Sequence, residues 1–417
     1  MEGKILERVR ERIEEALGDR LPGSLDGPGR LVIRAEEELH PFLLASLFPR
    51  LRGTLLVAAP GREAAEETAE ALRGLLGEEK VMELPCRELR IAGERGEDAE
   101  AVSRRARALS ALAGGRHLVV VCEARSLFRP FPTGEGALRP LRFRRGGEAD
   151  RDLSVERLTE MGYRREYLVE GGGQFAVRGG ILDVYDPALP LPVRLEFFGD
   201  RIDRVRFFHP ADQLSREELE EVEFYPVRSE GEGTAPVDLL REGGAVALLQ
   251  PLLIRERLRR VEEGDTPDLA ALRVRVPCLE LDPMAGAAHL SLSTLGVGDY
   301  RGRVADLVED LKGLLREGWS AVLLLEQEGR LRRLRDLLAG EGLPFLEEDG
   351  LVAGAVTLSR QGWGRGFRLP AARLALFTAR EIFGGPPRRP RPARPEGGRA
   401  VEGWWDLEEG DYVVHVN

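Results

Sequence analysis

Lysine decides whether this chain could hydrolyse a nucleotide at a P-loop. Such a loop needs a lysine followed by serine or threonine after a glycine-rich turn, because backbone amides and the ammonium hold the phosphates while the hydroxyl binds magnesium. The chain contains three lysines, and the residues after them are isoleucine, valine and glycine: Lys4, Lys80 and Lys312. The Asp-Glu pair of a helicase-type motor does not occur in the sequence. We therefore predict no catalytic site and no bound ATP or magnesium in this chain.

The cysteines and histidines offer no metal site either. Zinc ligands in short motifs are spaced a few residues apart in recognisable pairs. No such pairing is formed by the three cysteines and five histidines: Cys86, Cys122, Cys278, His40, His117, His209, His289 and His415. We expect the cysteines to be small buried hydrophobic residues. Glycine clusters at residues 171–173 and 362–366 do not open a helix as a dinucleotide loop must, so we expect turns there.

Composition indicates a globular protein of several domains. With 417 residues the chain is longer than one core usually serves, so we expect about three domains. No apolar run approaches the roughly 20 residues that cross a bilayer, and no signal peptide opens the chain, which predicts a cytoplasmic protein without a membrane partner. The net charge of −11 argues against nucleic acid wrapped over the whole surface, although local basic patches stay possible.

The first part of the chain alternates helices with short apolar strands. Ile5, Val9, Ile13 and Leu17 form one stripe at helical spacing, and Gly18 is placed to end that helix. Strand and helix signals then alternate as far as residue 121, which predicts a parallel sheet covered on both faces. Mixed α/β character returns at residues 234–295. A further unit follows, with helices at 304–315 and 329–339 and strands at 321–325, 355–358 and 374–377.

Residues 138–226 have a different sequence pattern, in which predicted strands alternate with glycine turns. We predict strands at residues 141–144, 175–177, 181–185, 193–198 and 205–208. Because side chains alternate along a strand, Val193, Leu195 and Phe197 share one side, which we expect to be the core. Gly199-Asp200 is placed to form the hairpin turn. The opposite face mixes arginine with phenylalanine: Arg178, Arg194, Phe198, Arg204, Arg206 and Phe208.

This mixed face supports three interpretations. Arginine and aromatic side chains are over-represented at protein interfaces and among binding hot spots, which favours a protein partner. The plainest alternative is a solvated sheet face with Phe198 covered by a neighbouring helix. Nucleic acid is the third, through arginine to phosphate and phenylalanine to bases, although Glu196 and Asp203 count against it.

Two segments within residues 175–208 carry a family resemblance. R-G-G-I-L-D-V-Y at 178–185 and V-R-L-E-F-F-G-D-R-I-D at 193–203 resemble the insertion domain shared by the excision-repair protein UvrB and the bacterial transcription-repair coupling factors (the Mfd family). UvrB has a P-loop in its first domain and this chain has none. Residues 410–415, G-D-Y-V-V-H, resemble the start of the coupling factors' RNA-polymerase-interacting domain. Both features favour the coupling factors.

The resemblance implies an α/β architecture. A degenerate P-loop-NTPase-like parallel-sheet domain, divided into subdomains at residues 1–137 and 227–298, would be interrupted by a small α+β insertion domain at 138–226. A small α/β domain would follow at residues 299–384. Residues 385–405 would be a Pro/Arg-rich linker, and residues 406–417 the start of a truncated RNA-polymerase-interacting domain.

The resemblance also implies a partner and its contact residues. UvrA would bind the insertion domain through Arg178, Arg194 and Phe198, so that the chain recruits nucleotide excision repair to RNA polymerase stalled at DNA damage. RNA polymerase, DNA, ATP and magnesium would be bound by parts of the parent protein outside this sequence. A rival interpretation gives DNA binding or translocation to this chain, with the five arginines of residues 386–399 touching phosphate. A third makes the chain a structural spacer that does not bind UvrA.

Overall fold

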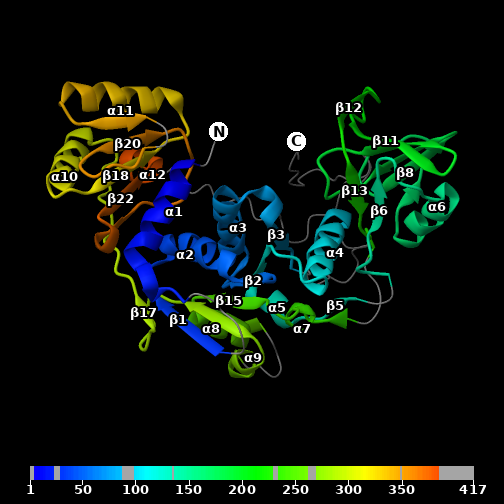
Figure 1. The fold of residues 1–417 in the computed structure, drawn as a ribbon, viewed down its shortest axis with the longest axis horizontal. Coiled ribbons are helices and arrows are strands. Elements are labelled where there is room, and N and C mark those ends of the chain that lie inside the picture. The colour runs from blue at the N-terminus through cyan, green and yellow to red at the C-terminus, as the bar shows by residue number, and fades with distance from the viewer. Residues whose placement is uncertain are drawn as a thin grey trace, which may run out of the picture.

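The protein has a central body with an arm on either side (Figure 1). The computed structural model describes these residues: 4–22, 29–86, 98–133, 136–228, 233–261, 269–347 and 350–384. The body comprises the described residues of 4–133 and 233–292, the insertion arm comprises residues 136–228, and the C-terminal arm comprises the described residues of 293–384. The predicted linker and the predicted start of a further domain, residues 385–417, lie outside the described residues.

A seven-stranded sheet forms the centre of the body, and its strands pair in parallel as the sequence predicts. In spatial order the strands are β17 (Leu290–Ser291), β1 (Gly29–Arg34), β16 (Pro277–Leu281), β15 (Ala245–Leu249), β2 (Leu55–Ala59), β4 (Val119–Glu123) and β3 (Val81–Leu84). Strand β15 pairs with β2, and β16 lies between β1 and β15. The two predicted subdomains, residues 1–137 and 227–298, therefore share one sheet. Its central strands β15 and β16 come from the second range, and their neighbours β1 and β2 come from the first.

Helices cover both faces of this sheet. The first face packs against α1 (Lys4–Leu17), α2 (His40–Leu47) and α3 (Arg62–Leu76). Against the second face lie α4 (Ala99–Ala113), α5 (Ala124–Phe128), α7 (Pro236–Leu239), α8 (Pro251–Val261) and α9 (Leu269–Arg275). Short 3-10 turns join these elements: η1 (Gly18–Arg20), η2 (Glu37–Leu39), η3 (Phe48–Arg50), η4 (Glu78–Lys80) and, in the C-terminal arm, η5 (Pro370–Ala372). The stripe predicted on the first helix is confirmed, since its four apolar residues are all buried.

The C-terminal arm is a five-stranded sheet whose two faces have different neighbours. Its order is β19 (Phe345–Glu347), β20 (Val356–Ser359), β18 (Ser320–Leu324), β22 (Leu374–Thr378) and β21 (Phe367–Leu369). One face packs against α10 (Val304–Arg316), α11 (Glu328–Gly340) and α12 (Ala379–Phe383). The other face places Val322, Leu324 and Leu376 in the same apolar core as α1 of the body. Trp363 adds a ring contact to Phe42 of α2, with centroids 4.8 Å apart.

The insertion arm is built on a six-stranded sheet with one long helix against it. Its order is β12 (Ser215–Glu218), β11 (Arg201–Phe208), β10 (Val193–Phe198), β9 (Ile181–Tyr185), β8 (Gln174–Arg178) and β7 (Arg164–Arg165). Helix α6 (Arg151–Glu160) and the pair β6 (Leu141–Arg144) and β13 (Glu221–Phe224) close the inner face over an apolar core. The pair β5 (Phe131–Pro132) and β14 (Gly233–Thr234) joins the chain entering and leaving the arm.

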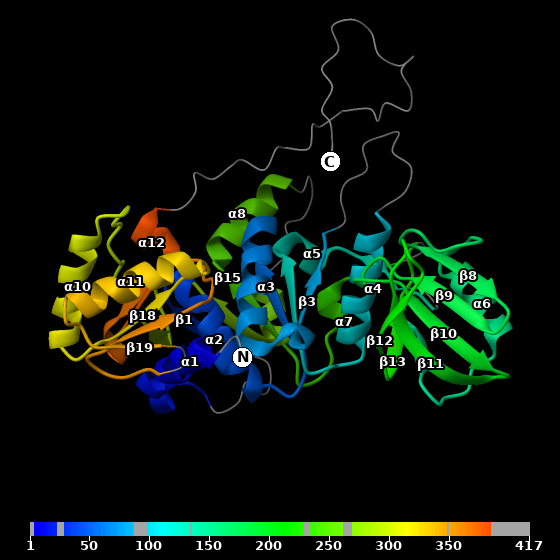
Figure 2. The same cartoon turned by 90° about the horizontal axis from the view of Figure 1, so that it is seen from above.

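A buried carboxylate connects the insertion arm to the body. Asp186, which follows β9, accepts hydrogen bonds from the Ser103 hydroxyl at 2.6 Å and from the backbone N–H of Ala188 and Tyr225 at 2.9 and 3.2 Å. Arg107 of α4 lies over the Tyr225 ring, 4.7 Å from its centroid, and pairs with Asp186 at 3.5 Å. Figure 2 shows α4 beside the strands of the arm. This joint is polar, unlike the apolar joint of the C-terminal arm.

Candidate partner-binding face

The outer face is the side of β8 to β11 that faces away from α6. On the inner side Val193, Leu195 and Val205 are fully buried in the core with α6. On the outer side Asp183, Arg194 and Arg206 lie directly opposite one another across three strands. Because residues opposite one another in paired strands share a face, the predicted division into a core face and a mixed face is confirmed.

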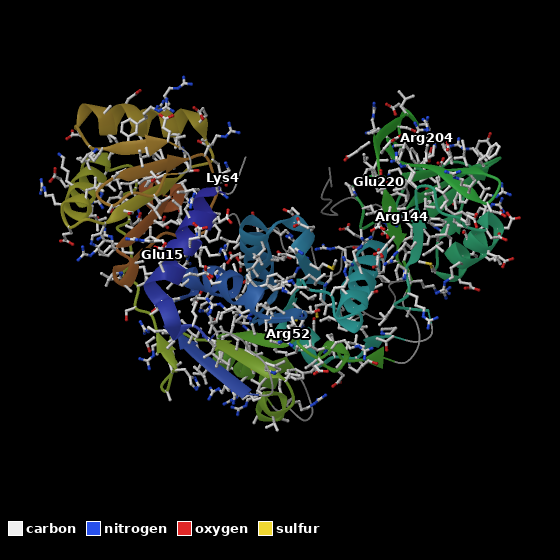
Figure 3. The ribbon with its side chains drawn as sticks, in the orientation of Figure 1. Lys4, Glu15, Arg52, Arg144, Arg204 and Glu220 are labelled. Atoms are coloured by element: carbon white, nitrogen blue, oxygen red, sulfur yellow. The ribbon has the colours of Figure 1, made fainter. Side chains whose placement is uncertain are left out.

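The hairpin between β10 and β11 sets which side chains reach the end of this face. Gly199-Asp200 makes the predicted turn, and Gly199 has a φ of +59°, which a side chain would disfavour. The strand register shifts after Glu196, so that Phe198 lies opposite Arg201. Strand β11 begins at Arg201 rather than at the predicted residue 205, because cross-strand pairing extends a strand through charged residues that carry no β signal of their own. Figure 3 labels Arg204 on this strand.

Arg194 is held by a fully buried carboxylate at the centre of the face. Its Nε and Nη2 donate to the two Asp183 oxygens at 2.7 and 2.9 Å, and its Nη1 donates to the Gln213 carbonyl at 3.1 Å. Its guanidinium lies over the Phe208 ring, 4.5 Å from the centroid. The hydrogen bond to Asp183 raises the pKa of Arg194 above its ordinary value. With a side chain 13% exposed, Arg194 chiefly organises this face.

Arg178 shares the same carboxylate but faces solvent. Its Nη2 donates to Asp183 at 2.6 Å and to the Gln213 amide oxygen at 3.4 Å, and its side chain is 36% exposed. Among the described residues, Nε and Nη1 of Arg178 have no hydrogen-bond acceptor. Arg178, Arg194 and Asp183 together carry one net positive charge. That charge is available to an acidic group from outside the chain.

The two phenylalanines of the face have opposite environments. Phe198 is 84% exposed, so the interpretation that a neighbouring helix covers it is wrong for the described part of the chain. Phe208 lies on the same mixed face, as predicted, but it is fully buried because Arg194 lies over its ring and Val169 packs against it. The exposed aromatic surface of these strands is therefore smaller than the strand pattern predicts. Of the two phenylalanines, Phe198 alone is exposed.

Sequence reasoning missed two residues that organise this face. Asp183 could have been found, because an acidic residue alternates with Leu182 and Val184 and so lies on the outer side of β9. Gln213 gives no such signal, since it lies in the loop between β11 and β12. It has a φ of +58°, and its amide oxygen accepts from both arginines. Only the folded loop brings it there.

The remaining candidates for chemistry are weak. Among the described residues no group of histidine, cysteine and carboxylate side chains could hold a metal ion. Cys122 and Cys278 are buried as predicted and Cys86 is half-buried; burial raises the pKa of Cys278 to about 12.

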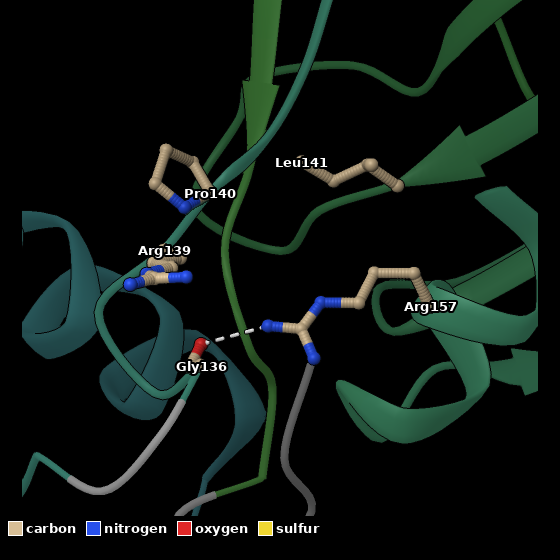
Figure 4. A pocket seen from close by; sticks show the side chains of 5 residues that line it. All are labelled: Gly136, Arg139, Pro140, Leu141 and Arg157. Carbon is tan, nitrogen blue, oxygen red and sulfur yellow. Dashed lines mark hydrogen bonds between the residues drawn. The ribbon is translucent and has the colours of Figure 1, made fainter. Parts of the chain in front are cut away.

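A hollow of about 430 Å³ at the base of the insertion arm is lined by Gly136, Arg139, Pro140, Leu141 and Arg157 (Figure 4). Its lining includes no nucleophile and no acid, and Arg157 donates to the Gly136 carbonyl at 3.1 Å.

Comparison with known proteins identifies the insertion arm. Residues 141–229 match a protein family described as the UvrB interaction domain. The transcription-repair-coupling factor of Myxococcus xanthus is 39% identical over 194 residues, covering 45% of this chain and 16% of that protein. The protein of the same name from Mycobacterium bovis is 31% identical over 343 residues, covering 77% and 27%. That of Bacillus subtilis is 22% identical over 450 residues, covering 85% and 38%.

These matches confirm the family resemblance of residues 175–208, and the chain spans less than half the length of each relative. Among solved structures, S. cerevisiae Dbp5 bound to RNA and ADP BeF3 is 9% identical, covering 85% of this chain and 70% of that one with a TM-score of 0.22. So low a score supports no conclusion about this chain. Among the described residues no helix is both long and apolar enough to span a membrane.

Proposed function

We propose that this chain, which contains a UvrB interaction domain and is homologous to part of the transcription-repair-coupling factors, binds UvrA through the outer face of its insertion arm. The observation that carries the proposal is the pair of unsatisfied groups on that face. Arg178, with Arg194 and Asp183, carries one net positive charge, and Phe198 exposes 84% of its surface. A carboxylate of UvrA would pair with Arg178, while an apolar pocket would receive Phe198.

Arg194 supports this face from within. Its substitution would leave Asp183 with one partner instead of two and would uncover Phe208. We therefore assign Arg194 to positioning Arg178 and place the direct contacts at Arg178 and Phe198. The resemblance implies contacts by Arg178, Arg194 and Phe198. We propose that Arg178 and Phe198 contact UvrA directly and that Arg194 positions Arg178.

The body favours recruitment over nucleotide hydrolysis. In a P-loop fold the phosphates lie at the turn between a strand and the N-terminus of the next helix. Here that turn, between β2 and α3, is Pro60-Gly61, and the Arg257 side chain of α8 lies against it. Arg257 Nη1 donates to the Pro60 carbonyl at 3.3 Å and lies 2.0 Å from the position a Cβ of Gly61 would take. The Arg257 side chain thus lies against the turn that would hold phosphates in a P-loop, and none of the three lysines completes that motif.

The wider role follows from the family. We propose that the chain brings UvrA, and with it nucleotide excision repair, to RNA polymerase stalled at DNA damage. Contacts to RNA polymerase and DNA, and the binding of ATP and magnesium, would belong to other parts of the parent protein. DNA binding by this chain is the rival function, and a steep fall of DNA affinity with rising salt would favour it.

The proposal is tested by titrating UvrA into the Phe198→Ala and Arg178→Ala variants and measuring affinity by calorimetry. Truncation of a hot-spot residue costs about 2 kcal/mol or more, so we expect each Kd to rise about 30-fold. Leu153→Ala is the matched control, because Leu153 is exposed on α6 behind the sheet. Wild-type affinity in both variants, with folding intact by circular dichroism, would refute the assignment. Measurable ATP hydrolysis by the chain would refute the recruitment-only role.

A further inference from the structure

Arg178 and Phe198 are too few to form a stable interface. A specific complex usually buries about 800 Å² on each partner, from roughly 20 residues or more. The surface around these two side chains must therefore contribute, and the structure limits where it can extend. Two loops border the outer face: the first covers residues 166–173, between β7 and β8, and the second covers residues 209–214, between β11 and β12.

The two loops are fixed to each other over the sheet. Val169 of the first loop is fully buried against Ala176 and Phe208 of the sheet. Gln213 of the second loop donates from its amide nitrogen to the Val169 carbonyl at 3.5 Å and to the Pro210 carbonyl at 2.8 Å. The bond to Val169 links the two loops, and the bond to Pro210 lies within the second loop.

Gln213 also fixes these loops to the arginines. The same side chain that donates to the loops accepts from Arg178 at 3.4 Å and from Arg194 at 3.3 Å. Its backbone is held in the left-handed region, at a φ of +58°, by a hydrogen bond from its own N–H to the His209 carbonyl at 2.8 Å. A residue other than glycine adopts that conformation only when the surroundings impose it. The loop position and the arginine positions are therefore coupled.

Each loop exposes a large apolar side chain. Tyr167, two residues before Val169, is 89% exposed, and Leu214, next to Gln213, is 58% exposed. Neither belongs to an apolar core of the described chain. Phe198 lies at the hairpin end of β10 and β11, whereas both loops lie at the opposite end of these strands, next to Phe208. The three exposed apolar groups thus belong to the two ends of the face that carries Arg178. Apolar and aromatic anchors around a charge-assisted contact are the usual composition of a binding hot spot.

We infer that Tyr167 and Leu214 form a second contact region for the partner that binds Arg178 and Phe198, and that Gln213 positions this region relative to the arginines. The inference rests on the proposed function, so the partner is UvrA. It extends the binding surface from the sheet onto the two loops. UvrA would meet the loops with apolar surface and the arginine with a carboxylate.

Calorimetric titration of UvrA against five variants tests this inference. We expect Tyr167→Ala and Leu214→Ser each to raise the Kd about tenfold, since each removes an exposed apolar contact. Gln213→Ala should raise the Kd by a similar factor through lost positioning. In the Arg178→Ala background, Gln213→Ala should raise the Kd by a smaller factor than it does in the wild type, because the two residues act through one contact. Leu153→Ser, on α6, should bind as the wild type does.

Hydrogen exchange gives a second readout on the unmodified chain. Binding of UvrA should slow exchange of the loop amides near Tyr167 and Leu214 as well as those at the end of β10. If Phe198→Ala weakens binding while Tyr167→Ala, Leu214→Ser and Gln213→Ala do not, the inference is overturned and the proposed function stands. If Phe198→Ala and Arg178→Ala also bind normally, the proposed function fails as well. Unchanged exchange in both loops on binding would equally overturn the inference.

Discussion

The two arms differ in how they use the faces of their sheets. Both faces of the C-terminal arm's sheet are apolar and covered, one by its own helices and the other by α1 of the body. The insertion arm covers only its inner face and meets the body at the buried carboxylate of Asp186. On its outer face no described residue covers Phe198, which is exposed.

The difference fits the proposed binding role of the insertion arm and a structural role of the C-terminal arm. A sheet face that shares a core with the body cannot leave it without exposing apolar surface, which costs about 25 cal/mol for each Å². A face on which arginines pair with a buried carboxylate is stable in water. It can still bind an acidic group through its net positive charge. The binding function is therefore proposed for the arm whose joint and face are polar. Two measurements probe the contrast between the arms, and a third probes the body that joins them.

The largest effect is expected from Asp183→Ala on the insertion arm. Removing a buried carboxylate leaves Arg178 and Arg194 without their shared counter-charge, which should lower the free energy of unfolding by about 3–5 kcal/mol. Hydrogen exchange of the amides of β9 and β10 measures this locally. Glu11→Ala is the control, because its ion pair with Arg8 is exposed and should contribute less than about 1 kcal/mol. Equal effects from the two substitutions would contradict the central place given to Asp183.

A smaller loss is expected from Ile13→Ala at the apolar joint. Ile13 is fully buried on α1, in the core that the body shares with the C-terminal arm. Truncation should cost about 3 kcal/mol from lost burial and the cavity left behind. Exchange should accelerate in β18 and β22 of the arm as well as in α1. If only α1 responds, the arm does not depend on the shared core.

The smallest effect is expected from acid, and it should fall on the body. Burial lowers the pKa of His40 from 6.5 to about 4, while its Nε2 lies 3.1 Å from the Ala35 carbonyl. Below pH 6.5 the unfolded chain binds a proton that the folded chain refuses, so stability falls as the pH falls. Between pH 7 and pH 5 the loss should be about 2 kcal/mol. Urea titrations at several pH values measure the free energy of unfolding. In the His40→Gln variant this free energy should no longer fall between pH 7 and pH 5 by the amount due to His40. An unchanged fall would contradict the prediction.

Strand faces were predictable from residue order, but burial was not. Alternation placed Arg194, Phe198 and Phe208 on one side of the sheet, and the structure confirms that side. It could not separate exposed Phe198 from buried Phe208, because the cover over Phe208 comes from Val169 in a distant loop. In the body, the apolar runs predicted a parallel sheet, yet nothing local shows that β15 and β16 insert between β1 and β2.

The sequence by itself determined that no lysine completes a P-loop motif, and it determined which strand face carries the arginines. Which residue follows each lysine is a matter of chain order, and side-chain alternation follows from the extended backbone. Only the tertiary structure decided which of the two arginines is partly exposed to solvent. Asp183 and Gln213 belong to separate segments, and their contacts bury Arg194 while leaving part of Arg178 in solvent. Which arginine is exposed depends on how segments that are distant in the sequence pack together, and this packing cannot be read from the order of the residues.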